Sequence, residues 1–201
     1  MKPNNGRLPI LGVTGGIGSG KSTVSKILKD AGAWIIDCDQ ISKALSLDVE
    51  VVQELKSVFG EEVVQEGKLN RKILASIVFE DKQKLQALNG IMHQKIAQRV
   101  ERELESIRGN RLFVLDLPLP VREGFLEKCH RVWVVAATIE KRLERICRRD
   151  ASTQEEVLKR INAQMTQEEY LKFADRVIYN EEDQQHLKGS VLNALDEFME
   201  T

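Results

Sequence analysis

The stretch Gly15-Gly-Ile-Gly-Ser-Gly-Lys-Ser22 decides the fold, because it matches the phosphate-loop pattern G-x-x-x-x-G-K-[ST] at every fixed position. A short apolar run at residues 10–13 precedes it, and residues 22–31 repeat apolar side chains on one helical face. In this strand–loop–helix order, the loop N–H groups and the positive end of the helix hold phosphate oxygens. The sequence therefore predicts a site for a nucleoside triphosphate.

Each residue type in the loop has a predicted task. Lys21 is expected to reach the β- and γ-phosphates, and the hydroxyl of Ser22 is expected to ligate Mg²⁺. A dinucleotide-binding loop fits less well, because Lys21 and Ser22 would have no role in it. The guanine-reading string N-K-x-D does not occur in the sequence, which favours ATP over GTP. The predicted ATP-binding residues of the loop are Gly15, Gly16, Ile17, Gly18, Ser19, Gly20, Lys21, Ser22 and Thr23.

The rest of the chain predicts an α/β protein. Further short apolar runs alternate with helical patterns at residues 34–36, 112–115, 132–135 and 176–178. Right-handed crossovers between such strands give a parallel sheet of about five strands, covered by helices on both faces. Helical inserts follow the second and the fourth strand. Both inserts leave from the carboxyl edge of the sheet, where ligands bind. They are therefore placed to form the walls and the roof of a cleft.

Some local details follow from single residues. Asn89 and Gly90 interrupt the helical pattern of the first insert, which allows a kink there. Ser152 with Glu155 fits a capping box that starts a new helix in the second insert. The two tryptophans lie in predicted strands and are expected in the core. They are Trp34 and Trp133.

Composition excludes several classes of protein. The 201 residues are 42% hydrophobic, and 30 Lys and Arg balance 31 Asp and Glu, so no global basic field indicates nucleic acid. The longest apolar run, residues 132–137, is far too short to span a membrane. No apolar signal stretch is visible near the start, which makes a cytoplasmic location the expectation. Three scattered cysteines form neither a disulfide framework nor a zinc site.

Carboxylates follow two of the predicted strands. Asp37 and Asp39 end the second strand, where a carboxylate within reach of an acceptor hydroxyl is what a kinase needs. Both point the same way only if the strand continues through them, and a turn with a helix cap is the alternative. Asp116 ends the third strand in a Walker B pattern, which predicts a carboxylate near Mg²⁺, through water. An ordinary strand-to-loop aspartate remains the alternative there.

Basic residues and histidines indicate a function less clearly than the phosphate loop does. A basic lid can neutralise charge on a transferring phosphoryl group, although a solvated helix face paired with glutamates is the alternative. The arginines of the second insert are Arg142, Arg145, Arg148, Arg149 and Arg160. The histidines have no metal-ligand spacing, and His93 taken alone is more typical of a structural or surface position.

Taken together, these motifs resemble the dephospho-CoA kinase family. The resemblance covers nearly the whole chain in family order. It rests on T-G-G-I-G-S-G-K-S-T, I-I-D-C-D, Phe59-Gly60, G-K-L-N-R ending at Arg71, L-N-G-I-M-H ending at His93, L-D-L-P-L, Arg149-Asp150, Gln164 and A-D-R-V-I-Y-N ending at Asn180. It implies transfer of the ATP γ-phosphoryl group to the ribose 3′-hydroxyl of dephospho-CoA.

The resemblance also implies an organisation of the chain and roles for residues. The expected P-loop core comprises residues 1–40, 110–138 and 174–201, with a helical substrate-binding region at 41–109 and a lid at 139–173. Asp39 is implied as the base and Arg149 as the best lid candidate, with Asn180 bordering the adenine. The implied substrate contacts are Asp37, Arg71, His93, Pro118 and Leu119.

Cys38 stands where the family usually has Ala, and the sequence departs from the family pattern in three further places. Lys43 stands where the family has Arg, Gln94 follows the histidine in place of Pro, and residues 118–123 alter the loop after the third strand. These departures concern the substrate cleft rather than phosphoryl transfer. A kinase for another small hydroxyl or nucleotide acceptor therefore remains an alternative, as does an ATP-gated regulatory module. No partner other than the substrate is indicated, and the oligomeric state is not predicted.

Overall fold

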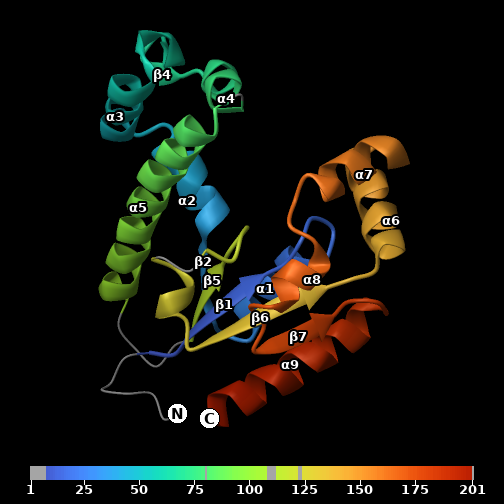
Figure 1. Cartoon of the computed structure of the whole chain (residues 1–201). Helices are drawn as coiled ribbons and strands as arrows, with labels where there is room; N and C mark the ends of the chain where they lie inside the picture. Colours follow the sequence, from blue (N-terminus) through green and yellow to red (C-terminus); the bar gives the residue numbers. More distant parts are fainter. Residues whose placement is uncertain (1–7, 80, 108–111, 122–123, 201) are drawn as a thin grey trace. The chain divides into compact units, whose positions relative to one another are not determined.

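A computed structural model describes residues 8–79, 81–107, 112–121 and 124–200. They form two compact units: the described residues up to 37 and from 107 onward belong to the first, and those between 38 and 106 to the second. The helices and strands are shown in Figure 1. In chain order they are β1 (Ile10–Thr14), α1 (Lys21–Asp30), β2 (Trp34–Asp37), α2 (Cys38–Leu45), α3 (Val49–Phe59), β3 (Val64–Gln65), β4 (Lys68–Leu69), α4 (Arg71–Phe79), α5 (Lys82–Ser106), β5 (Phe113–Asp116), β6 (Arg131–Ala136), α6 (Ile139–Asp150), α7 (Gln154–Asn162), α8 (Gln167–Leu171), β7 (Arg176–Tyr179) and α9 (Gln184–Glu200).

The first unit is built on a five-stranded parallel sheet with the order β2-β5-β1-β6-β7. The strand β1 lies at the centre. The chain first winds to β2 and β5 on one side of β1, and then to β6 and β7 on the other. Ligands bind where the winding of a parallel sheet reverses, at the carboxyl ends of the strands. The loop after β1 therefore starts at the binding edge, and the predicted α/β fold is confirmed.

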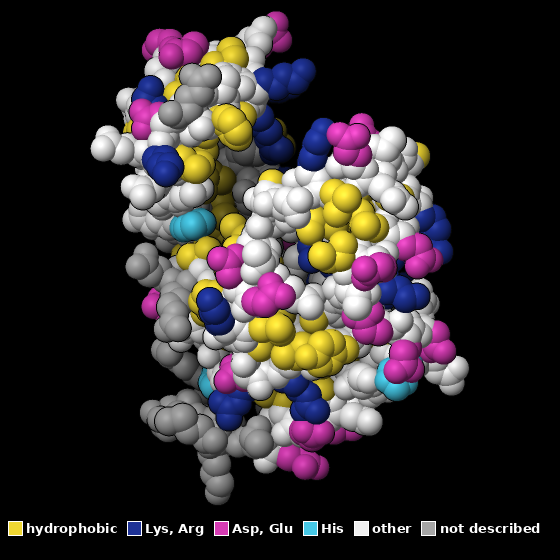
Figure 2. Space-filling view, turned by 45° about the vertical axis from the view of Figure 1, so that its right-hand side comes forward, with side chains coloured by type: hydrophobic (Ala, Val, Ile, Leu, Met, Phe, Trp, Pro, Cys, Tyr) yellow, Lys and Arg dark blue, Asp and Glu magenta, His cyan; other side chains and the backbone are white. Residues whose placement is uncertain are grey.

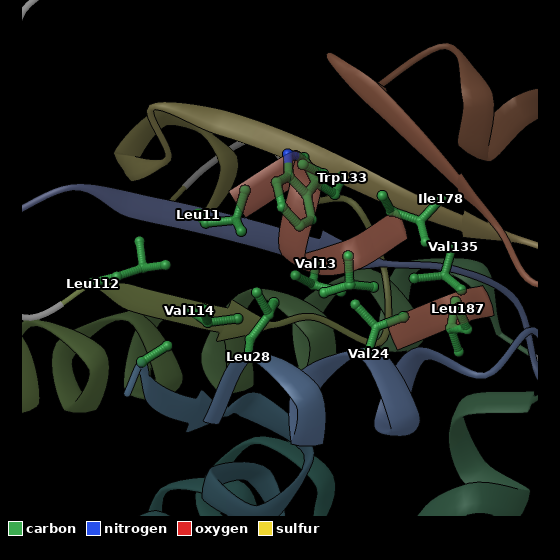
Figure 3. Packing of buried hydrophobic residues seen from close by; sticks show 13 residues of the cluster. Leu11, Val13, Val24, Leu28, Leu112, Val114, Trp133, Val135, Ile178 and Leu187 are labelled. Atoms are coloured by element: carbon green, nitrogen blue, oxygen red, sulfur yellow. The ribbon is translucent and has the colours of Figure 1, made fainter. Parts of the chain in front are cut away.

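Both faces of this sheet are buried. On one face α1 and α9 pack against side chains of β1, β5, β6 and β7, and Figure 3 shows these side chains pointing toward one another. Trp133 lies there, 2% exposed, as the sequence predicts. The alternate side chains of the strands, such as Leu115 and Val134, face the other way and are buried too. Burial on both sides explains why these strands are almost continuously apolar.

The second unit is helical. Its core joins α3, α4 and α5 with the short antiparallel hairpin β3–β4. Glu66 and Gly67 both have positive φ, which is the geometry of a two-residue hairpin turn. Asp48 caps α3 by accepting hydrogen bonds from the N–H groups of Glu50 and Val51. The sequence analysis did not predict this hairpin, because its strands are two residues long.

Two local predictions are wrong, that of a buried Trp34 and that of the capping box of α7. Trp34 is 37% exposed, because β2 is an edge strand of the sheet. The helix α5 runs without a break through Asn89 and Gly90. The capping box of α7 is formed by Thr153 and Glu156, one residue after the predicted pair. Both pairs fit the motif, and the hydrogen-bonded start of α7 at Gln154 selects the second.

The surface carries charges of both signs. Figure 2 shows Lys and Arg side chains interspersed with Asp and Glu over the viewed face, without a broad field of one sign. Among the described residues, no helix combines the length and the apolar character that crossing a membrane requires.

Candidate phosphate-binding site

The predicted phosphate loop connects β1 to α1. The helix α1 begins at Lys21, and its first N–H groups have no partner within the helix. They form the positive end that favours phosphate oxygens. Gly15 is buried, and a side chain there would collide with the carbonyl oxygen of Val135 on β6, 2.4 Å from the position of a Cβ. The loop backbone thus lies directly against the sheet.

Gly20 is a second position in the loop where a side chain would collide with its surroundings. Its φ of 98° is left-handed, and a Cβ there would lie 2.0 Å from Nδ2 of Asn180. The same Nδ2 donates to the carbonyl oxygen of Ser19 at 2.9 Å. The Asn180 side chain thus supports the loop through Ser19, while the absence of a side chain at Gly20 leaves room for it.

We therefore expect Gly20→Ala to weaken ATP binding at least about tenfold, because either the backbone of the loop or Asn180 must move. Titration of a fluorescent ATP analogue measures the change. Gly189→Ala is the matched control, because α9 leaves open space at that glycine. Unchanged ATP affinity in Gly20→Ala would contradict the geometry described here.

Lys21 and Asp116 form an ion pair at the base of the loop. Ser25, one turn further along α1, donates its hydroxyl to the other carboxylate oxygen of Asp116 at 2.7 Å. Asp116 is buried and ends β5, and it is in register with Asp37 at the end of β2. The strand β2 ends at Asp37 and α2 begins at Cys38, so the strand does not continue to Asp39.

The helix α6 contributes two arginines to the loop. Arg142 donates to the carbonyl oxygen of Ile17 at 2.8 Å. Arg145 donates to the carbonyl oxygen of Asn180 at 2.8 Å and, at 3.4 Å each, to those of Gly18 and Ser19. The sequence predicts both only as members of a cluster of arginines. Arg142 lies four residues before the buried Ile146, which places it on the buried face of the helix, and that spacing was the available signal.

Arg149 binds a carboxylate of its own helix, whereas Arg142 and Arg145 bind the backbone of the loop. It pairs with Asp150 at 2.6 Å, and Arg160 of α7 binds the same carboxylate at 2.7 Å. The two guanidinium groups hold the pKa of Asp150 well below its usual range. Among the described residues, Arg149 makes no hydrogen bond to the phosphate loop, and its role as the lid arginine stays a prediction.

The loop after β5 belongs to the same unit. Pro118 is exposed, and its carbonyl oxygen accepts a hydrogen bond from the hydroxyl of the buried Tyr170 at 3.2 Å. Leu119 is exposed as well. The altered glutamate at position 123 lies outside the described residues. Pro118 and Leu119 stay predicted substrate contacts.

The remaining predicted residues lie in the helical unit. Asp39 is exposed in the first turn of α2, and His93 lies in α5. Arg71 begins α4 and donates to the hydroxyl of Ser46. Lys43, Ser46 and Arg71 line a cavity of about 250 Å³ within this unit, whose other walls are largely apolar. A pocket with two cations and apolar walls suits an anionic ligand that carries an apolar arm.

The donor set of the loop fits Mg²⁺ together with a polyphosphate. Mg²⁺ is usually held by one or two carboxylates, a hydroxyl, waters and substrate phosphates, and not by a cage of protein side chains. Ser22 and Asp116 supply such oxygens. Within the described part of the chain, no group of three or more His, Cys, Asp or Glu side chains could hold a metal ion.

Comparison with known proteins decides the family. The family model described as dephospho-CoA kinase matches residues 9–186. The chain belongs to the dephospho-CoA kinase family. The dephospho-CoA kinase of Fusobacterium nucleatum is 41% identical over 172 residues, which are 85% of this chain and 89% of that protein. Another, from Dehalococcoides mccartyi, is 38% identical over 92% of this chain and 94% of its own length.

A solved structure has the same fold. A crystal structure from Thermus thermophilus covers 95% of this chain and 98% of its own, with a TM-score of 0.81 and 35% identity. The family resemblance and the P-loop kinase fold predicted from the sequence are thereby confirmed. Curated relatives in this family are kinases, so ATP is the expected phosphoryl donor.

Proposed function

We propose that this chain transfers the γ-phosphoryl group of ATP to the ribose 3′-hydroxyl of dephospho-CoA, giving CoA and ADP. Membership in the dephospho-CoA kinase family supports the reaction. The observation that carries the proposal in the structure is the joining of Lys21, at the end of the glycine loop, to Asp116 at the carboxyl end of β5. It unites the two halves of a P-loop nucleotide site at the binding edge of the sheet.

The loop residues would bind and orient the triphosphate. The N–H groups at the start of α1 and the ammonium group of Lys21 would hold phosphate oxygens and offset the charge that develops there. The glycines would let the backbone approach them closely, and Asn180 would border the adenine. Arg145, through its hydrogen bonds to the loop, would keep this arrangement in place.

The acceptor side would depend on Asp39. Its carboxylate would orient the 3′-hydroxyl and accept its proton as the new O–P bond forms. Asp37, Arg71, His93, Pro118 and Leu119 would contact the acceptor, and Arg149 would close over the transferring group. We propose the cavity beside Lys43 and Arg71 as part of the acceptor site, since its charges and apolar walls suit the diphosphate and arm of dephospho-CoA.

Mg²⁺ would be held by the Ser22 hydroxyl and, through water, by the Asp116 carboxylate. When bound, it neutralises phosphate charge and orients the polyphosphate. Lys21 and Ser25 hold the two oxygens of Asp116, which fixes the direction of this buried carboxylate.

ADP release with Mg-ATP and a panel of acceptors tests the proposal. We expect strong stimulation by dephospho-CoA, with CoA as the detected product, and little by AMP, adenosine, pantetheine or no acceptor. Stimulation by AMP or adenosine instead would show that the acceptor is a molecule other than dephospho-CoA. A slow ATP hydrolysis that no acceptor changes would favour an ATP-gated module.

A further inference from the structure

Arg142 is a buried cation packed on the phosphate loop. The residue is 4% exposed, and its Nε donates to the carbonyl oxygen of Ile17 at 2.8 Å. Its Nη2 is buried and has no hydrogen-bond partner among the described residues. The same nitrogen lies 2.8 Å from the position that a Cβ on Gly16 would occupy. The guanidinium group is therefore pressed against the loop backbone at Gly16 and Ile17.

The peptide groups of Ile17 are held on both sides. Arg142 binds the carbonyl oxygen, and Oε1 of Gln164 accepts a hydrogen bond from the N–H of Ile17 at 2.9 Å. Ile146, one turn after Arg142, fills the space at Gly18, where a Cβ would lie 2.8 Å from its Cδ1. The middle of the loop thus depends on the segment from α6 to Gln164 for its position.

Among the described residues, the charge of Arg142 has no counter-ion. No carboxylate in the described ranges pairs with it, and the titratable group that acts on it is the phenol of Tyr170. Burial lowers the pKa of Arg142, and burial raises that of Tyr170. A buried cation without an anion destabilises a folded protein, whereas an apolar group, or a neutral polar group that is hydrogen-bonded, costs much less in its place.

We propose that Arg142 is a positioning residue for the polyphosphate of ATP: it holds the Ile17 carbonyl and places an unpaired positive charge behind the loop backbone, which the bound phosphates neutralise. The inference rests on the proposed function only in taking ATP as the ligand, and does not depend on the acceptor. The free protein carries the cost of the unpaired charge, and nucleotide binding relieves it. The attraction by this charge grows with the negative charge of the nucleotide, so ATP gains more binding free energy from it than AMP does.

Two substitutions separate the charge from the hydrogen bond. Arg142→Gln removes the charge and keeps an N–H donor for Ile17, whereas Arg142→Lys keeps the charge and shortens the donor. Lys141→Gln is the matched control, since it removes one exposed positive charge from the same helix. Calorimetric titration with Mg-ATP, ADP and AMP, and melting of each variant with and without Mg-ATP, measure the effects without any phosphoryl acceptor.

For Arg142→Gln we expect the Kd for ATP to rise about tenfold or more, with a smaller rise for ADP and little for AMP. Its unliganded melting temperature should equal or exceed that of the unsubstituted protein, while the gain in melting temperature on adding ATP shrinks. Arg142→Lys should bind ATP within about threefold of the unsubstituted protein, and Lys141→Gln should match it.

Three results would overturn the inference. One is unchanged ATP affinity in Arg142→Gln, and another is an equal loss for ATP, ADP and AMP. The third is a lower unliganded melting temperature, or failure to fold, combined with a tenfold loss of ATP affinity in Arg142→Lys, since that pattern marks a purely structural arginine. A protein that binds ATP as expected but does not phosphorylate dephospho-CoA would contradict the proposed function alone.

Discussion

Asp39→Asn lowers kcat by roughly 10²–10⁴-fold and leaves the Kd for ATP almost unchanged; this is the largest effect that we expect of any single substitution. The amide keeps the size and much of the polarity of the carboxylate but cannot accept the proton of the 3′-hydroxyl. Asp39 is exposed in the first turn of α2, so the fold should tolerate the change. Single-turnover CoA formation and ATP titration measure the two quantities separately.

Asp30→Asn is the control for Asp39→Asn. Asp30 is exposed at the last position of α1 and has no predicted role, so this variant should keep the kcat of the unsubstituted protein. A near-full rate in Asp39→Asn would show that another group, or solvent, accepts the proton. For an ATP-gated module the substitution would leave a slow ATP hydrolysis intact, which distinguishes that class from a kinase.

Lys21→Ala is expected to weaken ATP binding and to reduce kcat by about 10²–10³-fold as well. The ammonium group would contact phosphate in both the bound and the transition state, where its charge counts most. Its loss also leaves the buried Asp116 with the hydroxyl of Ser25 as its remaining partner. Lys21→Arg keeps a cation beside Asp116, and should recover folding stability more than catalytic rate, because the bulkier guanidinium group alters the reach to phosphate.

The exposed Lys26, five residues further along α1, provides the control for Lys21→Ala. Lys26→Ala removes the same charge from the same helix and should leave both the affinity for ATP and kcat unchanged. Melting curves of all three variants separate a folding defect from a binding defect. Unaltered kinetics in a well-folded Lys21→Ala would exclude the assigned role of the loop.

Much of the first unit could be predicted because its signals are local. The glycine loop between a strand and an amphipathic helix has one fold that satisfies its backbone, and each predicted strand was found within one or two residues of its position. The start of α7 was wrong by one residue, since Ser152 with Glu155 and Thr153 with Glu156 fit the same motif equally well. Trp34 was wrong for another reason: strand order decides which strand lies at an edge, and a run of apolar residues does not contain that order.

Residues 15–22 by themselves predict the chemistry of the phosphate loop, because the residue types and their spacing are enough to identify a phosphate site. Which side chains from distant segments hold that loop was decided by packing alone. Arg142 lies 125 residues from Ile17, and Gln164 lies 147 residues from it. The five arginines of the second insert carry the same charge, and helical spacing places Arg142 on the face of Ile146 without saying which element covers that face. Only the folding of α6 against the loop buries Arg142 and leaves Arg149 exposed beside Asp150.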